Sequence, residues 1–200
     1  MARRRTARFP NVRFAVTTFE RWKPGREKHD LVIAASSFHW LSPKVANRKT
    51  ASVLKPGGWL AVFGNCHCVP THGFRRDSQR FYREHRGEAV KPGTNTRAGL
   101  RALAEATRRR IRRGGFFEAV AVRRYPWTAR FTTREYLGLL GTFSDHIRMP
   151  AAKREALFRD LKRLADSRYG GKVTRENVTT LWMAQRGQEL CHSRLLRKSS

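Results

Sequence analysis

Two short apolar runs, joined by a helix-forming segment, stand out between residues 30 and 65. The first run, residues 30–36, is apolar on both faces and has β-branched Val32 and Ile33 at its centre. This pattern predicts a strand covered by helices on both sides of a sheet. The second run, residues 59–65, is equally apolar. With the segment between them, the two runs predict one βαβ unit with adjacent parallel strands.

The helix between the two runs is identified by its ends. Ser42 can cap the first turn, and Pro43 suits that turn because an N–H missing there costs nothing. The sequence Lys55-Pro56-Gly57-Gly58 ends the helix, since proline cannot continue it and glycine reaches the positive φ of a tight turn. Small residues at 34–37 leave room for a ligand at the edge where open α/β sheets bind one.

Alternation of apolar and polar residues predicts the other strands. They are expected at residues 11–18, 116–125 and 178–184. Residues 66–96 form the longest irregular stretch, with a partial helix around Phe81 and Tyr82. Long loops of this kind are usually functional or disordered.

Helical spacing and stop signals predict three further helices. The first covers residues 97–113 and ends at Gly114-Gly115. The second follows Thr132, which has Glu135 at capping-box spacing. The third runs from Met149-Pro150 to Gly170-Gly171.

The composition suits one globular domain. A chain of 200 residues with 40% apolar content can bury a sizeable core, and disorder is expected only in the basic ends, residues 1–8 and 187–200. No apolar stretch approaches the roughly 20 residues needed to cross a bilayer, and no signal-peptide core follows Met1. The sequence therefore predicts a soluble cytoplasmic protein that does not bind a membrane.

The formal net charge of +28 is extreme. Such a field attracts nucleic acid or anionic lipid without sequence preference. Arginines occur in every segment, with runs at residues 3–8, 108–113 and 194–198. Two interpretations stay open: solvated basic faces, or a non-catalytic protein that binds nucleic acid or an acidic partner.

The three cysteines do not form a disulfide framework, since their number is odd. Cys66-His67-Cys68 with His72 nearby invites a zinc interpretation. Structural zinc sites, however, use ligands two to four residues apart and a second ligand pair. Cys191-His192 is the only other candidate pair and lies in the basic tail, so no metal site is predicted.

Three segments in order resemble class I S-adenosylmethionine-dependent methyltransferases. Asp30-Leu31-Val32-Ile33 is similar to the fourth strand, Ser37-Phe38-His39-Trp40 to the following loop, and Leu54-Lys55-Pro56-Gly57-Gly58-Trp59-Leu60-Ala61 to the start of the fifth strand. The His-Trp pair resembles the small-molecule branch that includes trans-aconitate methyltransferase. The resemblance covers residues 9–186.

The resemblance implies an α/β, Rossmann-like fold, with a mostly parallel sheet and an antiparallel C-terminal hairpin. Residues 9–14 resemble the start of the third strand, and no glycine-rich loop or acidic strand end precedes them. We therefore expect a truncated family member that lacks the first two strands. Binding of S-adenosyl-L-methionine, the implied cofactor, is expected to be weakened or lost.

The resemblance also implies where ligands would lie. Thr18 and Phe19 would flank the adenine of the cofactor, although many relatives carry an acidic residue where Thr18 stands, and Ala35 and Ser36 would lie near the cofactor at the strand end. Phe19 could equally pack in the core.

A small-molecule acceptor, in this branch a carboxylate, would meet His39, Trp40 and Arg75, with residues 66–96 covering it. Simple packing is the other interpretation of His39 and Trp40. No catalytic residue is assigned, because a sulfonium donor is already activated and catalysis consists chiefly of alignment and exclusion of water.

Overall fold

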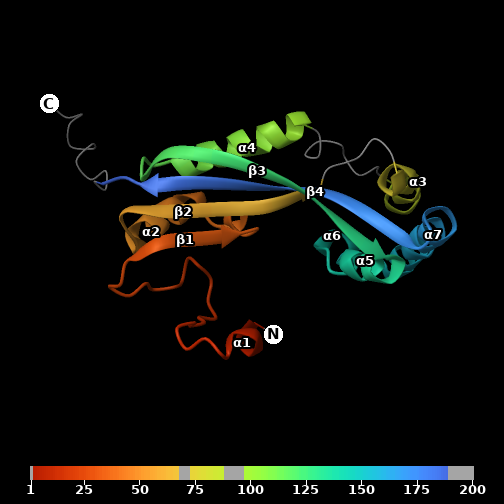
Figure 1. Ribbon diagram of the computed structural model, residues 1–200, viewed down its shortest axis with the longest axis horizontal. Helices are drawn as coiled ribbons and strands as arrows, with labels where there is room; N and C mark the ends of the chain where they lie inside the picture. Colours follow the sequence, from red (N-terminus) through yellow and green to blue (C-terminus); the bar gives the residue numbers. More distant parts are fainter. Residues whose placement is uncertain (1, 68–72, 88–96, 189–200) are drawn as a thin grey trace. The chain divides into compact units, whose positions relative to one another are not determined.

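The computed structural model describes residues 2–67, 73–87 and 97–188. In this part of the chain the strands form one mixed sheet in the order β1-β2-β4-β3 (Figure 1). β1 and β2 are parallel, and the other neighbours are antiparallel. The strands are β1 His29–Ala35, β2 Leu54–His67, β3 Phe117–Thr132 and β4 Lys172–Arg186. The predicted α/β class, parallel strand pair and antiparallel C-terminal hairpin are confirmed.

Helices connect the strands. They are α1 Ala2–Thr6, the 3-10 turn η1 Phe38–Trp40, α2 Pro43–Val53, α3 Gly73–Arg86, α4 Arg97–Arg112, α5 Thr133–Leu140, α6 Ser144–Ile147 and α7 Ala151–Tyr169. α1 lies in the segment for which the composition predicts disorder. Among the described residues, no helix combines the length and apolar composition that crossing a bilayer requires.

The chain divides into two compact units. Unit 1 comprises Met1–Val62, Arg110–Val120 and Met183–Ser200. Unit 2 comprises Phe63–Arg109 and Ala121–Trp182. β2, β3 and β4 each contribute residues to both units, so each unit is assembled from segments distant in sequence.

The predicted βαβ unit lies in unit 1, apart from the end of β2. α2 begins with Pro43 in its first turn, and β2 begins at Leu54 directly after the helix. Ser42 occupies the N-cap position, but its side chain makes no capping hydrogen bond. Its backbone N–H instead donates to Glu20 Oε1 at 3.0 Å, which ties the preceding loop to the start of α2.

A buried amide joins α2 to the end of α4. Asn47 Nδ2 donates to the carbonyl oxygens of Arg110, Ile111 and Arg113 at 2.7, 3.1 and 2.8 Å. Carbonyls in the last turn of a helix lack partners within the helix, so the Asn47 side chain supplies the missing donor. The buried apolar residues of unit 1 include Ala46, Ala51, Val53, Leu54, Leu60 and Ile111.

Two predictions for unit 1 are wrong. Residues 11–18 form no strand, and Val16 is 93% exposed. Alternation describes a strand only when another strand pairs with it, and none of the described strands does so here. β1 is not covered on both faces either, because Leu31 and Ile33, which lie on the same face of the strand, remain exposed. β1 is also an edge strand of the described sheet.

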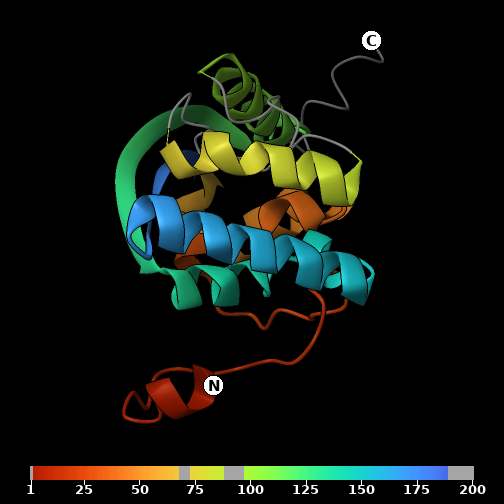
Figure 2. The ribbon, with the colours of Figure 1, turned by 90° about the vertical axis from the view of Figure 1, so that its right-hand side faces the viewer.

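Three helices form the core of unit 2. α3 and α7 lie side by side, and α5 also packs against α7 (Figure 2). The buried cluster consists of Phe74, Tyr82, Tyr136, Leu140, Leu157, Leu161, Leu164, Ala165 and Val173. α3 is a complete helix of 14 residues in the stretch predicted to be mostly irregular.

Local signals place the other helices of unit 2 well. The Thr132–Glu135 capping box is present at the start of α5, with both reciprocal hydrogen bonds formed. α7 ends at Gly170, whose φ of 57° is left-handed. β3 and β4 are both longer than predicted. Residues 68–72, 88–96 and 189–200, which include parts of the predicted covering segment and basic tail, lie outside the described residues.

Candidate functional site

Unit 2 contains a cavity of about 380 Å³. α3 lines it with Arg75, Tyr82 and Arg86, and β4 lines it with Arg175. Side chains of α5 and α6 also line the cavity, among them Tyr136, Leu140, Asp145 and His146. The site therefore collects residues that lie up to a hundred positions apart in the sequence.

Arg175 is the most unusual residue of this cavity. It is only 9% exposed and lies in β4 at the buried register, between Val173 and Asn177, which are both buried. Its guanidinium lies over the rings of Tyr136 and Phe143, at 6.0 and 5.5 Å from their centroids. Aromatic faces attract a cation and offset part of the cost of burying it.

No carboxylate neutralises Arg175 among the residues that the structure describes, since none of the ion pairs there includes it. Burial, and to a lesser extent the charge of Arg75, lower the pKa of the Arg175 guanidinium. Arginine nevertheless stays protonated in proteins. The cavity therefore holds a buried positive charge without a described counter-charge.

Arg75 adds a second guanidinium to the same cavity. Its Nε atom is buried and has no hydrogen-bond partner. None of the described ion pairs includes this residue. A buried N–H without a partner is costly and rare, so it indicates a position where a ligand can accept. Planar guanidinium groups suit carboxylates and phosphates, which accept from two N–H groups at once.

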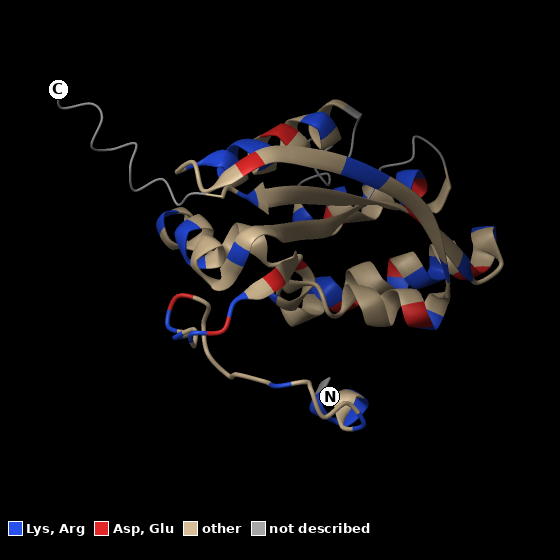
Figure 3. Cartoon of the chain, turned by 60° about the vertical axis from the view of Figure 1, so that its left-hand side comes forward, with Lys and Arg blue, Asp and Glu red and all other residues tan. Residues whose placement is uncertain are grey.

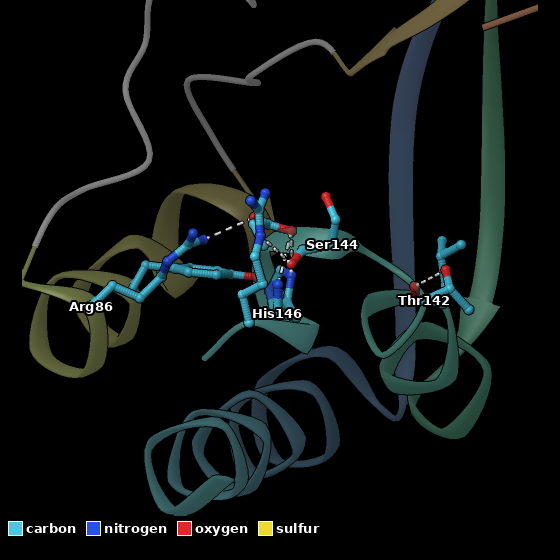
Figure 4. Close-up of polar contacts among 8 residues, drawn as sticks. Arg86, Thr142, Ser144 and His146 are labelled. Carbon is cyan, nitrogen blue, oxygen red and sulfur yellow. Dashed lines mark hydrogen bonds and ion pairs between the residues drawn. The ribbon is translucent and has the colours of Figure 1, made fainter. Parts of the chain in front are cut away.

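A chain of polar contacts borders the cavity (Figure 4). Arg86 Nη1 donates to Asp145 Oδ2 at 3.0 Å, and Asp145 Oδ1 lies 3.0 Å from His146 Nδ1. His146 Nε2 lies 3.4 Å from the hydroxyl oxygen of Tyr82. We refer to Arg86, Asp145, His146 and Tyr82 as the polar chain.

The ionisation of the polar chain follows from its burial. His146 is 3% exposed, and this burial lowers its pKa although Asp145 opposes the change. Burial would raise the pKa of Asp145, but His146 and Arg86 together hold it below its usual range. Burial raises the pKa of Tyr82. At neutral pH we therefore assign a neutral His146 that donates from Nδ1 to Asp145 and accepts at Nε2 from Tyr82.

The residues expected to flank a cofactor adenine lie in unit 1. Thr18 is exposed, and its carbonyl oxygen accepts from the backbone N–H groups of Arg21 and Trp22 at 3.1 and 2.9 Å. Phe19 is half-buried against Trp22, with ring centroids 6.1 Å apart, and Lys49 Nζ lies 5.5 Å from the Phe19 ring. The Phe19 ring could therefore face an adenine, but Trp22 and Lys49 already lie against part of it.

Ala35 and Ser36 lie at the carboxyl end of β1, and both are exposed. Ser36 has a φ of 49°, a left-handed conformation uncommon for residues other than glycine. Strain of this kind clusters at functional sites. Glu20, the acidic residue nearest in sequence to Phe19, already accepts from the backbone of Ser42. These residues present an open surface and do not fit a complete S-adenosylmethionine by themselves.

His39 and Trp40 lie together in η1, with ring centroids 4.8 Å apart. Both are exposed, and Trp40 is 80% exposed, so burial of Trp40 under the following helix is wrong. Phe38 is the buried aromatic residue of η1, and the Arg110 guanidinium lies over its ring at 5.5 Å from the centroid. Of the predicted substrate residues, only Arg75 lines the cavity of unit 2.

The structure adds site residues to which the sequence assigned no role, namely Tyr82, Asp145, His146 and Arg175. Arg175 lies outside the strand predicted at residues 178–184, so no inward position was predicted for it. The other three are unremarkable in sequence, because only the packing of α3 against α6 brings them together.

The residues weighed as zinc ligands lie mostly outside the described side chains. Cys66 is half-buried, and nothing is described of the side chain of His67 or of residues 68, 72, 191 and 192. Within the described residues, Glu84, His85 and Asp160 bring ligand-type atoms within 4.8 Å of one another. His85 is already paired with Asp160 at 2.8 Å.

Comparisons with known proteins agree with the fold. Residues 1–62 match the family model described as a methyltransferase domain. A comparison with curated proteins gives no match.

Among solved structures, the chain is similar to a protein assigned as a type II methyltransferase from Anaeromyxobacter dehalogenans, with 18% identity and a TM-score of 0.56. That alignment covers 90% of this chain and 73% of the other. The chain also aligns with the YcgJ protein of Bacillus subtilis at 15% identity and a TM-score of 0.46, covering 94% of this chain and 76% of the other. The sheet of this chain is accordingly of the methyltransferase type.

Proposed function

We propose that the chain serves S-adenosylmethionine-dependent methyl transfer to a small organic anion, which the cavity of unit 2 binds. The observation that carries this proposal is the pair Arg75 and Arg175, two guanidinium groups without a described carboxylate partner in one cavity. The methyltransferase-type fold supplies the reaction class.

The dimensions and lining of the cavity support a small acceptor. Its volume of about 380 Å³ lies at the lower end of the range for small-molecule sites. Tyr136, Phe143 and Leu140 offer apolar contact to the body of a ligand, while the guanidinium groups can bind a carboxylate. A carboxylate with a compact aromatic or aliphatic body combines both features.

Binding of the methyl donor by this chain alone is proposed to be weak. The residues expected to contact the donor, Thr18, Phe19, Ala35 and Ser36, lie on an open surface of unit 1. An open surface loses the enclosed contacts from which small-ligand affinity comes.

Two titrations of the purified chain test these statements separately. Calorimetry with S-adenosylmethionine is expected to show a dissociation constant well above the micromolar range, and micromolar affinity would overturn weak donor binding. Calorimetry with 3-nitrobenzoate is expected to show binding that Arg175→Met reduces and Arg159→Gln, an exposed arginine on α7, leaves unchanged. Equal affinity in all three proteins would overturn the acceptor site.

Nucleic-acid binding by a non-catalytic basic protein is the second candidate. Figure 3 shows lysine and arginine positions on helices and strands of both units, with few acidic positions among them. Retention of DNA at low salt that survives alanine at His39 and Trp40 and is lost when the arginine runs are neutralised would favour this candidate. Retention that disappears at physiological salt would leave the acceptor site as the better interpretation.

A further inference from the structure

The polar chain is not needed to bind a carboxylate, and its last member lines the cavity. Tyr82 donates its hydroxyl hydrogen to His146, and its side chain also forms a hydrogen bond with that of Tyr136. In this assignment Tyr136 donates to the Tyr82 oxygen, which keeps one lone pair for a further donor. An acceptor at this place suits a ligand group that carries a hydrogen. The cavity thus offers donors for an anion and an acceptor for an O–H group.

We propose that the cavity selects hydroxy acids, preferably phenolic ones, and that the polar chain takes the proton of the bound hydroxyl. This inference rests on the proposed function only in using the same cavity. The ligand carboxylate binds Arg175 and Arg75, and its hydroxyl donates to the oxygen of Tyr82. His146 is therefore a positioning and proton-accepting residue behind Tyr82.

The proton balance is complete within the chain. The ligand O–H bond breaks and its proton moves to the oxygen of Tyr82, while the hydroxyl proton of Tyr82 moves to His146 Nε2. The products are a ligand phenolate and an imidazolium, and Tyr82 ends neutral. Asp145, held by Arg86 at 3.0 Å, lies 3.0 Å from His146 Nδ1 and stabilises the imidazolium.

The groups around the polar chain act differently on the two products of this transfer. Arg86 and Arg75 reach the cavity from α3, Tyr136 from α5, Asp145 from α6 and Arg175 from β4. Three guanidinium groups against one carboxylate leave an excess of positive charge, which stabilises a phenolate. Burial and Arg86 oppose the imidazolium of His146, and Asp145 is the group that stabilises it. Other neighbours of His146 are aromatic: the rings of Tyr82, Phe143 and Phe158 lie 5.9, 6.0 and 5.9 Å from its own.

A chromogenic ligand tests the proposal without any methyl donor. The probe is 4-hydroxy-3-nitrobenzoate, whose phenolate absorbs in the visible range, and 3-nitrobenzoate is the matched ligand without the hydroxyl. Saturating protein is titrated across pH, and absorbance gives the pKa of the bound phenol. In the wild-type chain we expect this pKa to fall by about one unit or more relative to the free probe.

Variants separate the effect of the polar chain on the phenol pKa from the effect of the arginines. Tyr82→Phe keeps the ring against His146 and removes only the hydroxyl, and His146→Gln removes the proton acceptor. Both are expected to bind 3-nitrobenzoate as the wild type does and to lose most of the phenol shift, whereas Arg159→Gln keeps the shift. Near-ultraviolet circular dichroism confirms that each variant is folded.

Three results would overturn the proposal. The first is a bound phenol whose pKa in the wild-type chain equals that of the free probe. The second is a fall in the phenol pKa that persists in both Tyr82→Phe and His146→Gln, which would assign this fall to the arginines alone. The third is that neither nitrobenzoate binds. This result would also overturn the anion site of the proposed function, whereas the first two results overturn only the role of the polar chain.

Discussion

Arg175 carries a charge that the described part of the fold leaves without a carboxylate, and that imbalance determines how substitutions at this position should behave. Methionine at 175 keeps an unbranched chain of similar length and removes the cost of burying a cation. Replacing buried charges by well-packed apolar residues is often neutral or stabilising. We expect Arg175→Met to keep the urea midpoint of the wild-type chain or raise it.

The same substitution should abolish most anion binding. A hydrogen bond to a charged group contributes about 1.5–3 kcal/mol, which corresponds to about 10- to 150-fold in affinity. Calorimetry with 3-nitrobenzoate measures the loss, and Arg159→Gln serves as the exposed control. A less than twofold change in Arg175→Met would show that this guanidinium does not bind the ligand.

His146 gives stability a pH dependence with a defined sign. Burial lowers its pKa in the folded chain below the ordinary value of 6.5, so the unfolded chain binds a proton first as the pH falls. The stability that His146 contributes is present above pH 6.5 and is lost as the pH falls through the folded pKa. Urea midpoints between pH 7.5 and 5 should therefore decline less in His146→Gln than in the wild-type chain. Parallel declines would contradict the assignment.

Individual site residues could be predicted from the sequence only where their role did not depend on a partner far away along the chain. Arg75 was predicted to contact an anionic substrate, and it lines the cavity. Its role itself stays a prediction. His146 and Tyr82 could not be paired, since 64 residues separate them and only the packing of unit 2 joins them. Arg175 precedes the strand predicted at residues 178–184, and its aromatic partners lie on other elements, so neither its burial nor its contacts were predicted.

At the scale of elements, the Thr132 cap of α5 allows a clean test. Its side chain accepts from the backbone N–H of Glu135, whose carboxylate accepts from the Thr132 N–H at 2.8 Å. Thr132→Ala should lower the free energy of unfolding by about 1 kcal/mol. Thr128→Ala, an exposed position on the same strand, should change it by less than about 0.5 kcal/mol. Equal effects in thermal unfolding would mean that the cap contributes nothing.

Asn47 should matter more than any exposed residue of α2. Its amide satisfies three carbonyls at the end of α4, and removing it leaves buried acceptors without a donor. Such a loss costs about 1–3 kcal/mol. Chemical denaturation of Asn47→Ala, with exposed Arg48→Ala as control, measures the difference. Indistinguishable midpoints for the two variants would refute a stabilising role for this amide.

The elements that the sequence located well have local signals. Pro43 and the sequence Lys55-Pro56-Gly57-Gly58 act within a few residues, so α2 and the adjacent strands were predictable. The segment 11–18 shows the opposite case, because alternation cannot reveal whether a partner strand exists. Exposure of Leu31 and Ile33 likewise depends on which elements pack on their face of β1, and the apolar pattern of the strand does not reveal this.

At the scale of the molecule, the family match and the cavity fall on different segments of the chain. The match to a methyltransferase domain covers residues 1–62, whereas the cavity lies within unit 2, which begins at Phe63. Residues expected to contact the donor therefore belong to unit 1, and those proposed to bind the acceptor belong to unit 2. Variants in one unit should change the affinity for one ligand only.

Arginine side-chain NMR tests the acceptor site most directly. Nε–Hε signals of the wild-type chain are followed while benzoate is added, with Arg75→Gln and Arg175→Met used for assignment. We predict that the signals of Arg75 and Arg175 shift together with one dissociation constant, while those of exposed arginines such as Arg159 stay in place. Shifts spread over the exposed arginines, with Arg75 and Arg175 unchanged, would contradict an anion site in this cavity.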